Sequence, residues 1–574
     1  MARHSAAHYF LEGLYESGID YLFCNLGTDH VSIIEEVARW DQGNRPHPEL
    51  ITAPHEVVAV HMAGGYAIMT GKGQGVLVHV DAGTANAAMG LHNLCRGRVP
   101  VFLMAGRAPF TSRGELVGSR DTYVHFVQDP YDIASIVRPY IKWEYCLPSG
   151  VVAKELLARG HAMMMSEPTG PVFMSLPRET LAEEIEEEKV RSYPPARYGA
   201  VQAGGADPAV ARRIAEKLLE AGNPVAFCGY LGRKPEAVAA LQELALLAGI
   251  RIVSHYSVYM NCPHSSPAFA GFDPAPLLQE CDLGLLLDTD VPWVPSTHPH
   301  REDTCFIHVD VDAAKRDLPI WNFPGDLRVQ GDCATVLRQV AEALRELADE
   351  GFHRKIRARI GGWDAWHASR ARKLAEAASR TGESDAIAVP YLMAELNKQL
   401  RADDVIINEA IRNTGPVQDY LERSEPRTFV GFAGGGLGFS GGMALGAKLA
   451  RKESRVIQIV GDGSYHFGSP DAVYSVAQTH RLPIFTIVLD NRGWGAVKSA
   501  VQRVYPGGVA AQHDAFFSRL DTGEVRRLED VGKAFGAYGE RVTEAEDVPA
   551  AIRRCLERVE AGQAAVLTVR VTPI

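Results

Sequence analysis

Polar residues that suit a metal ion follow two apolar runs near the carboxyl end of the chain. Asp462 comes after the run 455–460, and Asn491 comes after the run 484–489. Both runs are typical of buried parallel strands, whose carboxyl ends meet at one edge of a sheet, where ligands bind. A carboxylate, an amide oxygen and a main-chain carbonyl are ligands that Mg²⁺ prefers. The pattern therefore predicts a magnesium site at this edge.

Small residues beside Asp462 offer a place for phosphate groups. Gly461 and Gly463 would let the backbone approach a diphosphate, and Ser464 would supply a further donor. A plain turn is the alternative, since Asp-Gly pairs are common in turns. The presence of Asn491 at the end of the next strand favours the metal and diphosphate site.

Two places in the first part of the chain could transfer protons. Asp29 and His30 form a suitable pair in the first strand-to-helix turn, and His79 ends an apolar strand. Each has a structural alternative. Asp29 could cap a helix over 31–39, and a single histidine at a strand end often has only a packing role.

Short apolar, β-branched runs alternate with helical segments along most of the chain. This rhythm is typical of parallel sheets with helices on both faces. A stretch rich in Pro, Gly and Ala at 193–207 and a basic helical stretch at 351–383 divide the sequence. The run 97–103 resembles the run 480–486, either by chance or because the first and third parts share a fold. We expect an α/β protein with three doubly wound parallel-sheet domains, at 1–190, 205–350 and 380–574.

The composition excludes several classes of protein. The 574 residues are 46% hydrophobic and 22% charged, as in ordinary globular proteins. The net charge of −11 and the lack of a long basic run argue against nucleic-acid binding. No apolar run reaches the ~18 residues of a transmembrane helix, and residues 1–8 lack a signal-peptide core. Nine cysteines without a C-x-x-C pair predict reduced thiols in a cytoplasmic protein.

The motif Gly461-Asp462-Gly463, followed by Asp490-Asn491, resembles the metal and diphosphate motif of thiamine-diphosphate-dependent enzymes. That family usually has Asn-Asn at the second place. Asp490 is therefore a departure, whereas Asn491 keeps the ligand position. The resemblance implies thiamine diphosphate and Mg²⁺ as cofactors, with the backbone of Gly493 as the third protein ligand.

Two other segments resemble the same family. The run 433–439 is similar to its Gly-Gly-Leu-Gly-Phe segment, in which Leu437 would wedge beneath the cofactor and the Gly435 carbonyl would accept from the 4′-amino group. The run 53–67 is similar to its His-Glu segment. There Glu56 would supply a proton to N1′ of the aminopyrimidine. The alternatives are core packing for Leu437 and a helix start, favoured by the dipole, for Glu56.

The resemblance covers almost the whole chain and looks most like the acetolactate synthase group. Residues 78–87 also resemble a stretch of benzoylformate decarboxylase whose histidine is a pocket acid/base, which would give His79 that role. Pyruvate decarboxylases carry an aspartate near the position of Asp29. The segments 228–232 and 288–293 lack the usual flavin-binding features, which argues against FAD.

We therefore expect a 2-oxo acid decarboxylase or carboligase that uses thiamine diphosphate and Mg²⁺ on a small-molecule substrate. The alternatives are a hydroxyacyl-CoA lyase, a flavin-dependent 2-oxo acid oxidase and a non-catalytic homologue. The family resemblance puts Glu56 and Asp462 of one cofactor site on different subunits. It thus implies a homodimer or homotetramer with cofactor sites at subunit interfaces. Neither nucleic acid nor membrane is expected as a partner.

Overall fold

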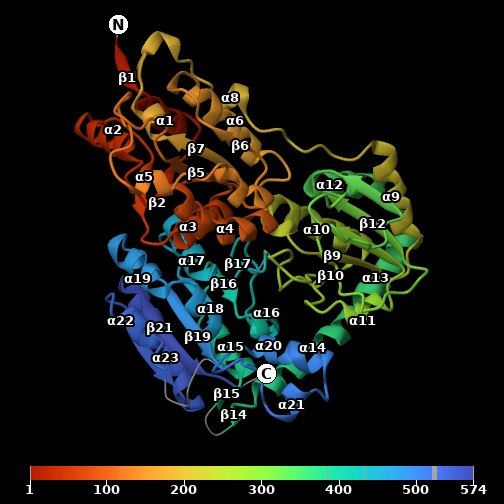
Figure 1. The fold of residues 1–574 in the computed structure, drawn as a ribbon. Coiled ribbons are helices and arrows are strands. Elements are labelled where there is room, and N and C mark those ends of the chain that lie inside the picture. Colours follow the sequence, from red (N-terminus) through yellow and green to blue (C-terminus); the bar gives the residue numbers. More distant parts are fainter. Residues whose placement is uncertain (1, 384–385, 432, 520–525, 573–574) are drawn as a thin grey trace.

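Three parallel β-sheets follow one another along the chain, each with helices packed against it (Figure 1). The computed structural model describes residues 2–383, 386–431, 433–519 and 526–572. Its sheets have six, five and six strands, in the first, central and third domains respectively. The expected fold class, three doubly wound parallel-sheet domains, is confirmed.

The first and third sheets have the same topology. In each, the strands lie in the order second, first, third, fourth, sixth and fifth along the chain. The first sheet consists of β3 (Glu49–Thr52), β2 (Tyr21–Cys24), β4 (Gln74–Val78), β5 (Val101–Arg107), β7 (Val172–Pro177) and β6 (Glu144–Cys146). The third consists of β17 (Phe429–Val430), β16 (Val405–Glu409), β18 (Val456–Gly461), β19 (Phe485–Asp490), β21 (Ala565–Arg570) and β20 (Tyr538–Val542).

This shared order explains the similar runs 97–103 and 480–486. Each leads into the fourth strand of its sheet, β5 or β19. Arg98 and Arg481, at equivalent points before these strands, both have φ of 54°. In both sheets the order reverses between the first and third strands, so that the loops after these two strands diverge and leave a crevice for ligands.

The central sheet consists of β10 (Arg251–Val253), β9 (Pro224–Cys228), β11 (Leu283–Leu287), β12 (Cys305–Asp310) and β13 (Leu327–Gln330). Helices α9 (Pro208–Glu220), α10 (Pro235–Ala248) and α12 (Cys333–Leu347) pack on it. The basic stretch after it forms α13 (Glu350–Gly361) and α14 (Trp363–Ala378), as its composition predicts. Among the described residues, no helix has the length and apolar character needed to cross a membrane.

Two helices join the first domain to the third at very short range. They are α3 (Glu56–Thr70) and α17 (Ser440–Ala450), which lie side by side in Figure 1. A Cβ on Gly446 would lie 2.0 Å from the Met62 carbonyl oxygen, and one on Gly65 would lie 2.2 Å from the Met443 carbonyl oxygen. Only glycine permits this contact between backbones, so the two helices fix the relative position of the two domains.

Candidate functional site

The predicted metal-binding residues lie at the carboxyl ends of two neighbouring strands. Strands β18 and β19 pair in parallel, with Gly461 opposite Leu489. The plain-turn alternative is wrong at this position, because Asp462 begins a short helix, α18 (Asp462–Phe467), in which it is only 2% exposed. Asn491 directly follows β19, and its Oδ1 accepts a hydrogen bond of 3.1 Å from the Gly493 amide.

A guanidinium group lies between the two aspartates of this edge. Arg526 Nη2 is 2.6 Å from Asp462 Oδ2 and 2.5 Å from Asp490 Oδ1. Arg541 reaches the other Asp490 oxygen at 3.2 Å. Burial raises the pKa of Asp462, and the contact with Arg526 opposes that rise. No sequence pattern indicated Arg526, because this residue lies far from Asp462 along the chain.

The surroundings of Asp462 suit a metal ion with a diphosphate. Gly461 is open, since a Cβ there would meet nothing within 4 Å, whereas Gly463 lies directly beneath the Trp494 ring. Ser464 is buried in α18. A cavity of about 910 Å³ is lined by Asn491, Gly493 and Trp494. The oxygen donors present fit Mg²⁺ chemistry.

The loop that contains Leu437 is held from two sides. Gly438 has φ of +93°, and a Cβ there would lie 2.4 Å from the Phe467 carbonyl carbon, so this turn requires glycine. On the other side, Asn93 Nδ2 donates to the Gly436 carbonyl at 2.9 Å. Leu437 itself is only half-buried, unlike a residue of the hydrophobic core. Gly435 is exposed, and its amide donates to the ring of His92.

A buried glutamate that the sequence analysis missed supports this loop. Glu409 ends β16 and accepts from the Gly438 amide at 2.5 Å and from the Ser440 amide at 2.9 Å. It also accepts from the Ser440 hydroxyl. Burial raises the pKa of Glu409 to about 7 despite these hydrogen bonds. A glutamate at the end of a strand that begins with three apolar residues was the available signal.

Glu56 lies at the corresponding edge of the first sheet. It begins α3, as the helix-start alternative required, but its carboxylate is bound by residues of other elements. Asn25, just after β2, donates to Oε1 at 2.9 Å, and Asn86 in α4 (Val80–Arg96) donates to Oε2 at 3.0 Å. The residue is 6% exposed. Two amides therefore hold the carboxyl group in one orientation, and neither was singled out from sequence.

Asp29 and His79 form a close pair after β2 and β4, at the point where the strand order reverses. His79 Nδ1 donates to Asp29 Oδ1 at 2.5 Å. The hydrogen bond to Asp29 is the main reason why the pKa of His79 is raised. The helix-cap alternative for Asp29 is not what the structure shows, because His30 takes the N-cap position of α2 (Val31–Gln42).

His30 and Asp29 lie beneath His79. His30 is fully buried, its Nδ1 accepts from the Gly27 amide, and its Nε2 lies 3.3 Å from Asp29 Oδ2. Burial lowers the pKa of His30, which favours the neutral ring. Asp29 is 1% exposed, whereas the His79 side chain is 26% exposed. Of the three groups, His79 is thus the one accessible to a small molecule.

A third histidine borders this group, and the sequence analysis did not single it out. His125 lies in α5 (Val124–Val127), is 4% exposed, and places Nε2 3.4 Å from the Thr28 hydroxyl. Burial lowers its pKa. The segment 108–128 has little regular structure, so no strand end or helix face indicated the position of His125.

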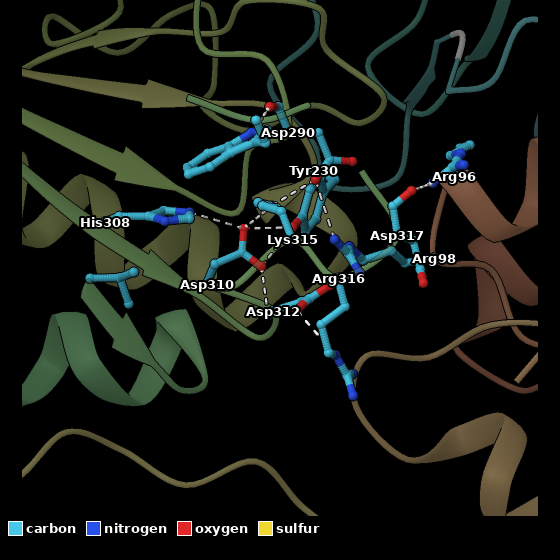
Figure 2. Close-up of polar contacts among 12 residues, drawn as sticks. Arg96, Arg98, Tyr230, Asp290, His308, Asp310, Asp312, Lys315, Arg316 and Asp317 are labelled. Carbon is cyan, nitrogen blue, oxygen red and sulfur yellow. Dashed lines mark hydrogen bonds and ion pairs between the residues drawn. The ribbon is translucent and has the colours of Figure 1, made fainter. Parts of the chain in front are cut away.

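In the central domain, charged and polar side chains that contact one another occupy the carboxyl ends of the strands. We call this group the central cluster; it comprises Arg98, Tyr230, Asp290, Asp310 and Lys315 (Figure 2). Lys315 Nζ lies 2.6 Å from both Asp290 Oδ1 and Asp310 Oδ2, and 2.8 Å from the Tyr230 hydroxyl.

The central cluster also joins the central domain to the first. Arg98 of the first domain donates to Asp290 at 3.2 Å and lies over the Tyr230 ring. Burial opposes ionisation of Asp310, but Lys315 keeps the pKa of that carboxyl below its usual range. The charges are therefore satisfied by one another, in the crevice where such sheets bind ligands.

Three family profiles match the chain in succession. They are "Thiamine pyrophosphate enzyme, N-terminal TPP binding domain" at residues 4–136, the central domain of the same enzymes at 211–340, and their C-terminal TPP binding domain at 413–569. The first profile contains Glu56 and His79, and the last contains Leu437, Asp462 and Asn491.

Similar proteins cover nearly the whole chain at low identity. The acetolactate synthase large subunit of Haemophilus influenzae is 24% identical, over 88% of this chain and 86% of its own length. Benzoylformate decarboxylase of Pseudomonas aeruginosa is 25% identical, over 86% of this chain and 87% of its own length.

Solved structures have the same fold. Benzoylformate decarboxylase from Polynucleobacter necessarius superposes with a TM-score of 0.77 at 18% identity, over 100% of this chain and 99% of that one. The thiamine diphosphate-dependent 4-hydroxybenzoylformate decarboxylase of Rhodococcus jostii RHA1 superposes with a TM-score of 0.76 at 20% identity, over 99% of each chain.

Proposed function

Because the chain belongs to the thiamine pyrophosphate enzymes, we propose that it breaks or forms the C–C bond beside a carbonyl group. The proposed substrate is a 2-oxo acid, and the proposed cofactors are thiamine diphosphate and Mg²⁺. The observation that carries this proposal is the arrangement of Glu56. Its carboxyl group is buried at a sheet edge and held by two amides in one orientation, as a fixed proton donor requires.

Each half of the proposed site has its own task. Asp462, Asn491 and the Gly493 carbonyl would hold Mg²⁺, while Gly461, Gly463 and Ser464 would face the diphosphate. Gly435 and Leu437 would position the aminopyrimidine. When bound, thiamine diphosphate supplies a carbanion that adds to a carbonyl and stabilises the charge left when CO₂ departs. Glu56 would hold and return the proton at N1′.

His79 is the proposed acid/base toward the substrate. Asp29 accepts the Nδ1 proton, which leaves Nε2 of the neutral ring as an acceptor. The raised pKa favours a second proton on the ring, which His79 could deliver to a developing oxyanion or carbanion. Asp29 and His30 are buried, so we assign them the positioning of His79 rather than contact with the substrate.

The two kinds of relative suggest two outcomes for the last step. A proton delivered by His79 would complete a decarboxylation, whereas attack on a second carbonyl would complete a carboligation of the acetolactate synthase kind. A hydroxyacyl-CoA lyase remains an alternative. The central cluster supports leaving flavin out of the proposal, because Tyr230 and Lys315 fill the crevice of the central sheet.

We further propose a cytoplasmic homodimer or homotetramer whose sites combine Glu56 of one subunit with Asp462 of another. The proposed domains span 1–190, 205–350 and 380–574. An active monomer in light scattering at assay concentration would refute the shared site.

The activity test uses purified protein with thiamine diphosphate and Mg²⁺. It measures CO₂ release from pyruvate and benzoylformate, with and without an acceptor aldehyde, and cleavage of a 2-hydroxyacyl-CoA. We expect cofactor-dependent CO₂ release from at least one of the acids. Cleavage of the thioester alone would favour the lyase, and no cofactor-dependent reaction with any of them would contradict the proposal.

A further inference from the structure

Asp462, the expected metal ligand, is in contact with a cationic side chain, Arg526, which is unusual for a residue that binds a metal ion. The guanidinium bridges Asp462 and Asp490 through a single nitrogen, Nη2. Its other two nitrogens, Nε and Nη1, are buried and have no hydrogen-bond partner in the described part of the chain. Buried unpaired donors are costly, and a guanidinium offers five N–H groups in a fixed plane. Arg526 is therefore equipped for an additional acceptor.

Asp490 anchors this arginine. It stands where the resembled motif has asparagine, and the extra carboxylate binds both Arg526 and Arg541. Asp490 Oδ1 also accepts from the Arg492 amide at 3.1 Å. Among the described residues, Arg526 is the only cation that contacts Asp462. If Arg526 moved away from Asp462, its contact with Asp490 could persist, so a short rotation would suffice to free the metal ligand.

We propose that Arg526 has two partners in turn. Without cofactor, its guanidinium takes the place of a metal ion beside Asp462. With Mg²⁺ and the cofactor bound, it leaves Asp462 and directs Nε and Nη1 to the diphosphate, while Asp490 retains Nη2. This inference rests on the proposed function, specifically on Asp462 as the metal ligand.

Two physical reasons support the exchange. A guanidinium and a divalent cation cannot both lie against Asp462 Oδ2 without strong repulsion, so metal binding must displace Arg526. The diphosphate oxygens are acceptors of the kind that arginine binds with two parallel N–H groups. Metal alone should therefore bind weakly, and metal with diphosphate should bind as a unit.

The test uses the full-length apo-protein and the substitution Arg526→Gln. Calorimetry measures Mn²⁺ alone, and quenching of tryptophan fluorescence measures thiamine diphosphate in saturating Mg²⁺, since Trp494 packs on Gly463. We expect the Arg526→Gln variant to bind Mn²⁺ alone at least tenfold more tightly than wild type does. It should bind thiamine diphosphate roughly tenfold to a hundredfold more weakly than wild type. Arg527→Gln, a neighbouring exposed arginine, should change neither affinity.

The exchange predicts that Mn²⁺ affinity rises while thiamine diphosphate affinity falls. A merely structural role of Arg526 would not change the two affinities in opposite directions. If both affinities fall, or if Mn²⁺ affinity is unchanged, Arg526 does not compete with metal and the inference is wrong. Arg526→Lys keeps the charge but not the planar donors. It should keep Mn²⁺ binding weak while still reducing cofactor affinity. As a control for folding, the apo-variants should have the same melting temperature as wild type. Should Asp462→Ala bind Mn²⁺ as well as wild type, the metal assignment itself fails, independently of Arg526.

Discussion

Replacing Asp29 with asparagine tests how the chain prepares His79 for proton transfer. The change removes a charged acceptor 2.5 Å from His79 Nδ1 but nearly keeps its shape. A hydrogen bond to a charged group contributes about 1.5–3 kcal/mol, and one pKa unit corresponds to about 1.4 kcal/mol. The pKa of His79, which Asp29 raises above its usual value, should therefore fall in the variant.

The substitution also changes which ring nitrogen carries the proton. Asparagine can donate to Nδ1, and the neutral ring would then carry its proton on Nε2, the wrong nitrogen to accept from the substrate. We expect kcat/KM at neutral pH to fall by roughly 10²-fold, the scale of a lost acid/base group. Binding of thiamine diphosphate should not change, because Asp29 contacts neither Glu56 nor the proposed metal ligands.

The assay is the pH dependence of kcat/KM. If protonated His79 is the acid, activity is present below its pKa and lost as the pH rises through it. The Asp29→Asn variant should lose activity at a lower pH than wild type. Asp81→Asn is a matched control, since Asp81 raises the pKa of His79 less than Asp29 does. An unchanged profile, or a loss of rate that matches the loss of folded protein, would refute the reasoning.

Three other predictions concern the two halves of the site. Glu56→Gln should keep cofactor binding in calorimetry and reduce turnover by ~10²-fold or more, because an amide cannot give the proton to N1′; near-normal turnover would reduce Glu56 to a helix-start residue. Asp462→Ala should weaken Mg²⁺ and thiamine diphosphate together, and calorimetry showing unchanged affinity would overturn the metal assignment. The pKa of Glu409 is raised to about 7, so the free energy of unfolding should decrease as the pH rises from about 4.3 through 7. Urea unfolding should show this decrease in wild type and lose it in Glu409→Gln; the same pH dependence in both would exclude Glu409 as its source.

The fold and the common location of the proposed metal ligands could be predicted because their signals are local. Asp462 and Asn491 each follow an apolar strand directly, and parallel strands bring such positions to one edge. The matching runs before β5 and β19 had left chance and a shared fold open, and the common strand order of the two sheets agrees with the shared fold. The position of His79 could be predicted from the strand end. Its pairing with Asp29 became apparent only in the structure, where the strand order reverses between β2 and β4.

The supporting residues could not be predicted, because their partners are distant in sequence. Asn25 and Asn86 bind Glu56 from positions 31 and 30 residues away, on different elements. Arg526 reaches Asp462 over 64 residues. Asparagine and arginine are common on protein surfaces, so only the assembled sheet edges distinguish these side chains from solvated ones.

The close contact between α3 and α17 has a consequence for how the chain can be dissected. Because Gly65 and Gly446 place two backbones against each other, neither helix has a solvated surface on that side. A fragment that ends before α17 would expose the apolar length of α3, whose residues Glu56–Met69 are all buried. The first and third domains should therefore resist separate expression and need each other to remain in solution, even though each has a complete sheet of its own.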